Sequence, residues 1–130
     1  MINQNTARAD IFKEFYDLIK DKISGLMVTV SFVDEESKLP QLVINAPTLP
    51  RLKETYDRYN RSGDIEIDIY AKSIKTLTNI YDEVESLIIS NKLNLSVQSI
   101  SINESTLATI QLSQKQVHTK TMTVSFTFRG

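Results

Sequence analysis

The sequence predicts an α+β domain in which two helices pack on one face of a mainly antiparallel or mixed β-sheet. Three observations lead to this class. The stretch Gly63–Asn91 has the pattern of one strand running straight into one long amphipathic helix, a second amphipathic segment lies near the N-terminus, and several other short runs alternate apolar and polar residues. In chain order the predicted elements are α-β-β-β-α-β-β-β. The 130 residues are expected to form one domain, with residues 1–6 as a flexible polar arm.

The central strand and helix carry the clearest periodicity. Ile65, Ile67 and Ile69 recur at every second position, so their side chains share one face of a strand. The helix is expected to begin at Ser73, whose hydroxyl can accept from backbone N–H groups of the first turn, and to end at Asn91 in a left-handed conformation. The apolar residues of this helix recur with a period of 3.6: Ile74, Leu77, Ile80, Tyr81, Val84, Leu87 and Ile88.

An earlier helix is expected over Ala7–Ile23, with Gly25 at the left-handed cap position. Two strands should follow it, Met27–Val33 and Leu42–Ile44, joined as a hairpin through the charged turn at 34–38. The apolar stripe of the earlier helix consists of Ile11, Phe12, Phe15, Leu18, Ile19 and Ile23.

Three extended runs follow the second helix. Leu93–Ile102 changes the parity of its apolar residues, so a bulge is expected near Ser99; Leu107–Leu112 is short; and Val117–Arg129 is the longest strand. In this last strand, one face is apolar, with Met122, Val124, Phe126 and Phe128, and the other carries Thr119, Thr121, Thr123, Ser125 and Thr127. An exposed, uncharged edge of this kind favours pairing with another chain, so Thr123 and Ser125 are candidate interface residues.

Composition restricts the function. Lys and Arg number 15 against 16 Asp and Glu, and this near-neutral balance argues against a dedicated nucleic-acid binder. The chain has no cysteine, which excludes disulfides, thiolate nucleophiles and thiolate metal ligands. No segment resembles a signal peptide or a membrane span, so we expect the protein to be made in, and to remain soluble in, a cytoplasm. The three glycines are far apart, so no phosphate-binding glycine loop is expected.

The connection Asn45–Ser62 is unusually long for a compact domain, and such loops are often functional. It combines cationic and aromatic residues, a composition that favours contact with a neighbouring protein over contact with nucleic acid. Lys72 and Lys75 lie in or near the first turn of the second helix, where the helix dipole disfavours cations, so acidic neighbours in this chain or in another copy are expected to compensate them. The candidate contact residues of the loop are Arg51, Lys53, Tyr56, Arg58, Tyr59 and Arg61.

Two groups could carry chemistry. Glu66 and Asp68 share the strand face opposite the isoleucines, and paired carboxylates can bind a hard cation such as Mg²⁺; the alternative is a solvated or interface-facing side. His118 is the only histidine and has no evident partner base or acid, so an exposed strand histidine is the alternative to a catalytic one. A metal-dependent enzyme or nuclease that uses Glu66 and Asp68, and a nucleic-acid-binding module, stay open as alternative functions.

Three segments resemble a known family: Ile-x-Ile-x-Ile-Tyr-Ala-x-Ser at 65–73, Leu-x-x-Ile-Tyr-Asp-Glu-Val at 77–84, and Thr-Val-Ser-Phe-Thr-Phe-Arg at 123–129. Together with the layout of residues 8–129, they resemble the tail-terminator proteins of long-tailed phages and related viruses, also called tail-completion or neck proteins. The resemblance implies a small α+β subunit of a hexameric ring that sits on the last ring of the tail tube, stops its growth and offers a surface to the head connector.

The resemblance implies a structural virion protein, assembled in the host cytoplasm, with no enzymatic activity, cofactor or metal and no membrane partner. Its expected partners are further copies of the chain, the tail tube protein and the head-connector protein, with nucleic acid touching at most the lumen of the ring. A head–tail connector or tail tube protein is the alternative within this class. Because the resemblance supplies no residue-level motif, the interface residues stay hypotheses from the sequence: the loop residues above, Glu66, Asp68, Lys72, Lys75, Thr123 and Ser125.

Overall fold

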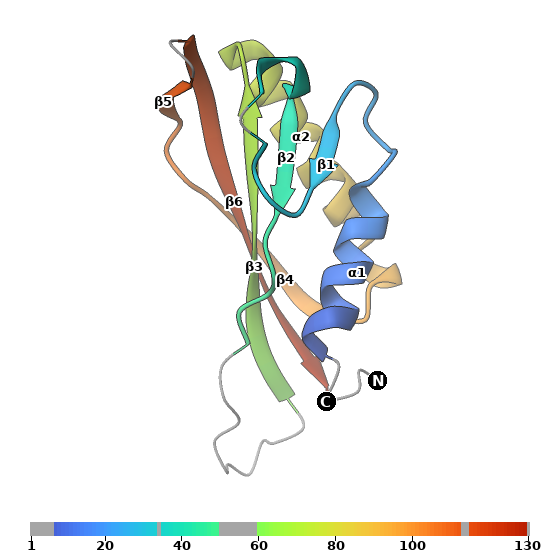
Figure 1. The fold of residues 1–130 in the computed structure, drawn as a ribbon. Helices are drawn as coiled ribbons and strands as arrows, with labels where there is room; N and C mark the ends of the chain where they lie inside the picture. The colour runs from blue at the N-terminus through green and yellow to red at the C-terminus, as the bar shows by residue number, and fades with distance from the viewer. Residues whose placement is uncertain (1–6, 34, 50–59, 113–114, 130) are drawn as a thin grey trace.

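The computed structural model describes residues 7–33, 35–49, 60–112 and 115–129. These ranges contain two α-helices and a six-stranded mixed sheet, which confirms the predicted α+β class and element order (Figure 1). The elements are α1 (Ala7–Ile19), β1 (Met27–Thr29), the 3₁₀ turn η1 (Glu36–Lys38), β2 (Gln41–Ile44), β3 (Asn60–Ala71), α2 (Ile74–Ser90), the 3₁₀ turn η2 (Lys92–Asn94), β4 (Gln98–Glu104), β5 (Ala108–Leu112) and β6 (Lys115–Arg129).

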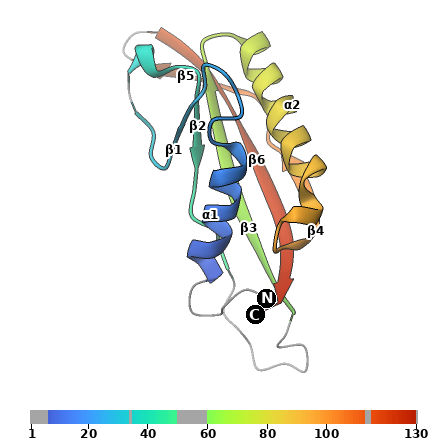
Figure 2. The same ribbon diagram turned by 90° about the vertical axis from the view of Figure 1, so that its right-hand side faces the viewer.

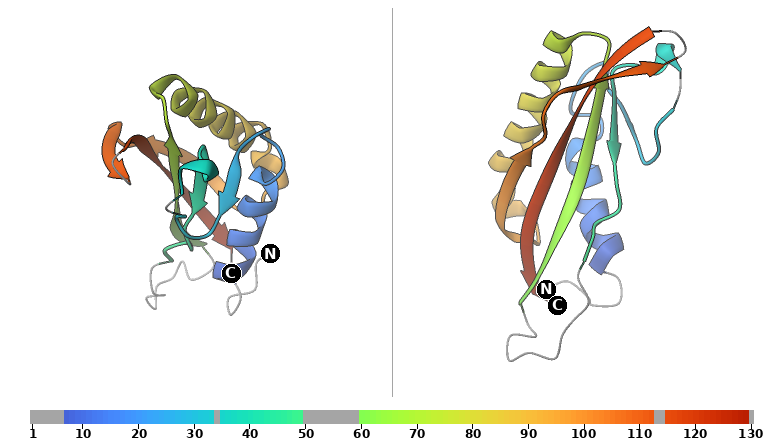
Figure 3. Two further views of the ribbon diagram at one scale, coloured as in Figure 1. Left: turned by 45° about the horizontal axis from the view of Figure 1, so that its top comes forward. Right: turned by 90° about the vertical axis from the view of Figure 1, so that its left-hand side faces the viewer.

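The sheet is built around β3 and β6, two long antiparallel strands that pair from Asn60–Arg129 to Ala71–His118. Strand order is β1-β2-β3-β6-β4. β5 also pairs with β6, so β4 and β5 follow each other along the edge of β6 that faces away from β3 (Figure 3). All pairs are antiparallel except β1 with β2.

Both helices cover the same face of the sheet, as predicted (Figures 1 and 2). The alternation of β3 and β6 places one parity of each strand under these helices, where the side chains are buried to the last few per cent. No helix in the described ranges is long and apolar enough to cross a membrane. The buried residues of the two strands that join the helices in one core are Ile65, Ile67, Ile69, Ala71, Met122, Val124, Phe126 and Phe128.

The start of α2 is confirmed and its end is corrected. Ser73 is the N-cap, and its hydroxyl accepts from the Thr76 N–H at 3.2 Å. Asn91 has φ −111°, so it is not the left-handed residue that we predicted. It ends the helix differently: its side-chain amide donates to the Leu87 carbonyl at 2.8 Å and so satisfies one of the last carbonyls of the helix.

The predicted N-terminal helix is shorter than expected. α1 ends at Ile19 because Asp21 adopts φ 60°, a left-handed conformation that a helix cannot continue through. Gly25 is left-handed as predicted, with φ 77°, but it lies in the turn before β1 and does not cap the helix. Ile23 still packs half-buried against the core from outside the helix.

The predicted hairpin of the first two strands is wrong. β1 ends at Thr29, Val30 is 60% exposed, and β1 pairs parallel with β2. The intervening segment instead folds back over the sheet face that the helices leave open. The Gln41 side chain is fully buried there, accepting from Val33 N–H at 2.7 Å and donating to Val33 O at 3.0 Å, and Phe32 packs on the Tyr70 ring with centroids 4.4 Å apart.

The later strands are mostly as predicted, with two corrections. The expected bulge exists: Ser99 has φ 52° and the register shifts between Gln98 and Ser101. However, β4 begins only at Gln98, because residues 92–94 form a 3₁₀ turn. β6 is not the exposed edge that we expected from its uncharged sequence, because it lies between β3 and the pair β4 and β5.

Candidate functional site

The helix-free face of β3 and β6 brings four of the predicted interface residues together. Its alternating outward residues are carboxylates on β3 and hydroxyls on β6, in direct register: Asp64 opposite Ser125, Glu66 opposite Thr123 and Asp68 opposite Thr121. We call these six residues the open-face ladder. Figure 3 shows that no helix covers this side of the central strands. The ladder therefore presents a polar, hydrogen-bonding surface.

Hydrogen bonds hold two of the three carboxylates in place. Asp68 Oδ2 accepts from the Asn45 side-chain amide at 2.9 Å, and Asp68 Oδ1 accepts from the Thr121 hydroxyl at 2.6 Å. Asp64 Oδ1 accepts from the Ser125 hydroxyl at 2.6 Å. These short contacts to ionised oxygens belong to the stronger class of hydrogen bonds, so the two side chains have fixed directions.

Glu66 is the carboxylate left for a partner. It is exposed, and its side chain makes no hydrogen bond or ion pair with any residue that the structure describes. Both oxygens of Asp68 and one oxygen of Asp64 already accept hydrogen bonds, so Glu66 is the carboxylate with both oxygens available to a cation or a donor that approaches this face.

Among the described residues, no third ligand joins Glu66 and Asp68, the two carboxylates that could bind a metal ion. Within the described ranges, no three side chains among His, Asp and Glu are placed to hold a metal ion together. Asp68 uses both of its oxygens for hydrogen bonds inside the protein, and Ser125 occupies an oxygen of Asp64. The geometry of the ladder is that of a hydrogen-bonded surface.

The other predicted interface residues lie elsewhere. Lys72 and Lys75 are exposed on the connection from β3 to α2 and in the first turn of α2, past the end of the ladder. The first turn of α2 contains no acidic residue to compensate Lys75. Arg61 is a residue of β3, paired with Phe128, and its side chain lies outside the described part. The loop residues Arg51, Lys53, Tyr56, Arg58 and Tyr59 also lie outside the described residues.

An apolar groove, which we did not predict, lies between α1 and the end of β2. It has a volume of about 540 Å³. It exists because β1 ends at Thr29, which leaves the chain beyond Ile44 without a β1 partner on that side. The residues that line it include Arg8, Phe12, Val30, Ile44, Ala46 and Pro47. A parallel pair that ends early has no signature in the sequence.

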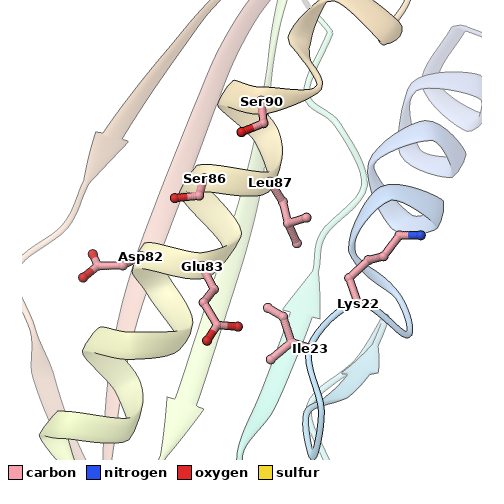
Figure 4. A pocket seen from close by; sticks show the side chains of 7 residues that line it. All are labelled: Lys22, Ile23, Asp82, Glu83, Ser86, Leu87 and Ser90. Atoms are coloured by element: carbon pink, nitrogen blue, oxygen red, sulfur yellow. The ribbon is translucent and has the colours of Figure 1, made fainter.

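A second hollow, of about 390 Å³, lies between α2 and the turn that follows α1. Figure 4 shows Glu83 and Leu87 of α2 pointing toward Ile23, whereas Asp82 and Ser86 point away from it. The mixture of apolar side chains with charged residues at the rim, among them Lys22, is typical of an ordinary helix–turn crevice.

Tyr81 is a buried residue of α2 with an unusual environment. Its ring lies under Lys120 Nζ, 4.6 Å from the ring centroid, and Lys120 pairs with Glu104 at 2.8 Å. The Tyr81 hydroxyl is buried without a hydrogen-bond partner among the described residues. Burial, with the nearby charges of Glu104, Glu85 and Asp82, raises the pKa of Tyr81 to about 12.

Two further polar residues are structural in their surroundings. His118 Nδ1 lies 3.1 Å from the Thr109 hydroxyl across the β5–β6 pair, and it is half-buried, so its surroundings differ from the exposed strand histidine of our sequence interpretation. The pKa of Tyr70 is raised by burial and by the charge of Asp68, while a hydrogen bond with Thr119 lowers it.

Comparison with known proteins identifies no relative. No protein-family model matches the chain, and no curated protein matches its sequence. The function is therefore inferred from the residues and the geometry described above.

Proposed function

We propose that this protein is a structural subunit that assembles with copies of itself into a ring, in the manner of the tail-terminator proteins that its sequence resembles. In this role the ring caps the tail tube, stops its growth and provides the interface to the head connector of a virion. Its partners are neighbouring copies, the tail tube protein and the connector protein.

The observation that carries the proposal is the one-sided construction of the sheet. Its helix side is packed with apolar residues, whereas the opposite side carries the open-face ladder with Asp64 and Asp68 fixed by hydrogen bonds and Glu66 exposed. Fixed polar groups on a rigid strand lose little conformational entropy when they bind, which suits a surface made for a protein partner. A subunit of a closed ring needs such surfaces on different sides, because its contacts are heterologous.

The test is the particle that the purified chain forms. Light scattering should give a single mass several times that of the chain, and negative-stain electron microscopy should show closed rings with a central hole. Long tubes would instead favour a tail tube protein, which is the alternative within the class. A chain that stays monomeric at every concentration, and that also fails to bind the ends of tail tubes, would rule the proposal out.

A variant tests whether the open-face ladder takes part in the assembly. Glu66→Lys places a cation in the middle of the polar face without touching the core and should weaken a contact that uses this carboxylate. Glu83→Lys, on the exposed side of α2, is the matched control and should leave the contact unchanged. If the two variants assemble and bind tubes equally well, the open-face ladder is not a contact surface.

A further inference from the structure

The sheet has two edges whose main-chain groups are not used by described strands. On one side, β1 pairs with β2 up to Thr29 opposite Val43, and this parallel register also uses the N–H of Ile44, so only the outer side of the chain beyond Ile44 has no strand partner among the described residues. On the other side, β4 pairs only with β6. Unpaired edges are templates for another strand.

The two unpaired edges lie at the same height in the sheet. The strand pairings can be followed across it from one edge to the other. The residues at one level are Glu104, Met122, Ile67 and Ile44, and those at a second level are Ser101, Ser125, Asp64 and Thr48. The segment 101–104 of β4 is therefore level with the segment 44–48 at the opposite edge, which contains one residue more, so the register below is counted from the level of Glu104 and Ile44.

The main-chain directions of the two edges also match. Asn45 N–H donates to Glu66 O at 3.0 Å, so the main-chain groups of its neighbours Ile44 and Ala46 point away from β3. Ser105 N–H donates to Thr121 O at 2.9 Å, so those of Ile102 and Glu104 point away from β6. At both edges, the residues whose main chain points outward have their side chains on the helix side, as the packing of Ile44 and Ile102 against the core shows. Residues directly opposite each other in an antiparallel pair share a face, so the two edges can join without turning the sheet over.

The groove beside β2 suits the side chains that would arrive. The segment 98–103 carries no charge and no proline, so nothing in it opposes pairing. Ile102 would bring an apolar side chain toward Phe12 and Ala46, which line the groove. Glu104, the one charged residue of β4, already pairs with Lys120 of its own copy at 2.8 Å, so β4 brings no unpaired charge to the exposed Arg8 at the groove.

We propose that β4 of one copy pairs antiparallel with residues 45–48 of the next copy, with Ile102 opposite Ala46, so that the sheet continues from subunit to subunit. Strand directions alternate across the sheet, so β4 runs opposite to β2 and the new pair is antiparallel when both copies have the same orientation. The contact is head-to-tail and closes into a ring if its rotation divides a full turn. The inference rests on the proposed ring function and names the lateral contact of that ring.

The absence of cysteine makes the contact testable by disulfide formation. In the proposed register Asn103 faces Asn45 as a non-hydrogen-bonded pair, whose short Cα separation of about 4.5 Å lies within the range of a disulfide. Asn103→Cys and Asn45→Cys are prepared as separate proteins, mixed and mildly oxidised. Gln111→Cys, on the exposed β5 part of the same edge, replaces Asn103→Cys in the control mixture.

The expected result is a covalent dimer in the mixture, at least tenfold more abundant than in either protein alone or in the control. The double variant Asn45→Cys/Asn103→Cys should give a series of covalent oligomers, the largest of which is the complete ring. Strong cross-linking of Asn103→Cys with itself would show a two-fold β4–β4 contact and overturn the proposal. Oligomers by light scattering without the cross-link would overturn this contact alone, whereas a chain that stays monomeric and also fails to bind the ends of tail tubes would overturn the ring as well.

A second variant removes one hydrogen-bond donor of the edge. Ala46→Pro deletes an N–H that points away from β3, a position at which proline is compatible with an edge strand. It should abolish assembly while thermal unfolding of the monomer stays close to that of Ala46→Ser, the control that keeps the N–H. Unchanged assembly of Ala46→Pro would contradict the proposed pairing.

Discussion

The two faces of the β3–β6 pair are made by the same two strands and are built for different purposes. Ile67 and Met122 on the helix side are fully buried, whereas their neighbours in sequence, Glu66 and Thr123, face the open side. The helix side holds the chain in one fold by removing apolar surface from water. The open side adds hydrogen bonds between exposed groups, which stabilise little but fix directions. If the proposed ring forms, alternate residues of one strand serve stability and assembly separately.

The largest expected effect is a loss of packing on the helix side. Ile67→Ala should lower the free energy of unfolding by about 2–5 kcal/mol, because it leaves a cavity in the core between the sheet and the helices. Glu66→Ala, one residue away on the other face, should change it by less than about 0.5 kcal/mol. Denaturant unfolding of the two variants measures the contrast, and equal losses would mean that the two faces do not divide their roles.

A smaller loss of stability is expected from a substitution at Gly63, near the start of β3 on the helix side. An added Cβ would lie 2.5 Å from Leu49 Cδ2, 3.0 Å from the Thr48 carbonyl oxygen and 3.1 Å from Phe126 Cε2. Leu49 can rotate away, but the Thr48 backbone bridges to β3 and resists movement. Gly63→Ala should therefore cost about 1–3 kcal/mol in thermal or denaturant unfolding. A neutral result would show that this end of the sheet adapts easily.

The open face should yield a coupling of about 0.5–1.5 kcal/mol between Asp68 and Thr121, whose side chains are 2.6 Å apart. A double-mutant cycle of Asp68→Ala and Thr121→Val measures it by denaturant unfolding. Asp64 and Ser125 form an equivalent pair and should behave alike. Absence of coupling in both pairs would mean that the ladder is not fixed in solution.

The smallest effect concerns Tyr81, whose buried hydroxyl lacks a partner among the described residues. Tyr81→Phe should raise the free energy of unfolding by roughly 1 kcal/mol, because it removes a desolvated polar group. Burial, and then the charges of Glu104, Glu85 and Asp82, raise its pKa to about 12 from an ordinary 10.0. Ionisation of Tyr81 therefore leaves the free energy of unfolding unchanged below pH 10 and lowers it as the pH rises from 10 to about 12.

An ultraviolet titration of tyrosinate absorbance checks this pH dependence. The last ionisation step should disappear in Tyr81→Phe and should persist in Tyr16→Phe, a matched change at a half-buried helix tyrosine. Loss of the late step in the Tyr16 variant instead would contradict the assignment.

The sequence was sufficient for features that depend on neighbouring residues. The period of two in Ile65–Ile69, the cap at Ser73 and the parity change at Ser99 are local, and each was found in the structure. The parallel pairing of β1 with β2 was not predictable in this way, because it depends on where the segment after Val30 is held. Gln41, eight residues after Val33, and Tyr70, which packs on Phe32 from far along the chain, hold that segment.

The open-face ladder was predicted only in part, because its contacts between strands also depend on more than local sequence. The outward parity of Glu66, Asp68, Thr123 and Ser125 follows from alternation, but their pairing across the strands depends on register, which no local pattern specifies. Asn45 donates a hydrogen bond to Asp68 from a separate connection, and no pattern in the sequence indicated this contact. The groove beside β2 depends on where a neighbouring strand ends.

The most direct test of the account is amide hydrogen exchange measured at low and at assembling concentrations. Joining of copies through the sheet edges predicts slower exchange at Ile102 and Ala46, whose N–H groups point outward. Thr109 and Gln111 of β5 also point outward but lie outside the contact, so their exchange should stay the same. Protection that rises equally in β5, or that fails to rise at Ile102 and Ala46 while particles form, would contradict the account.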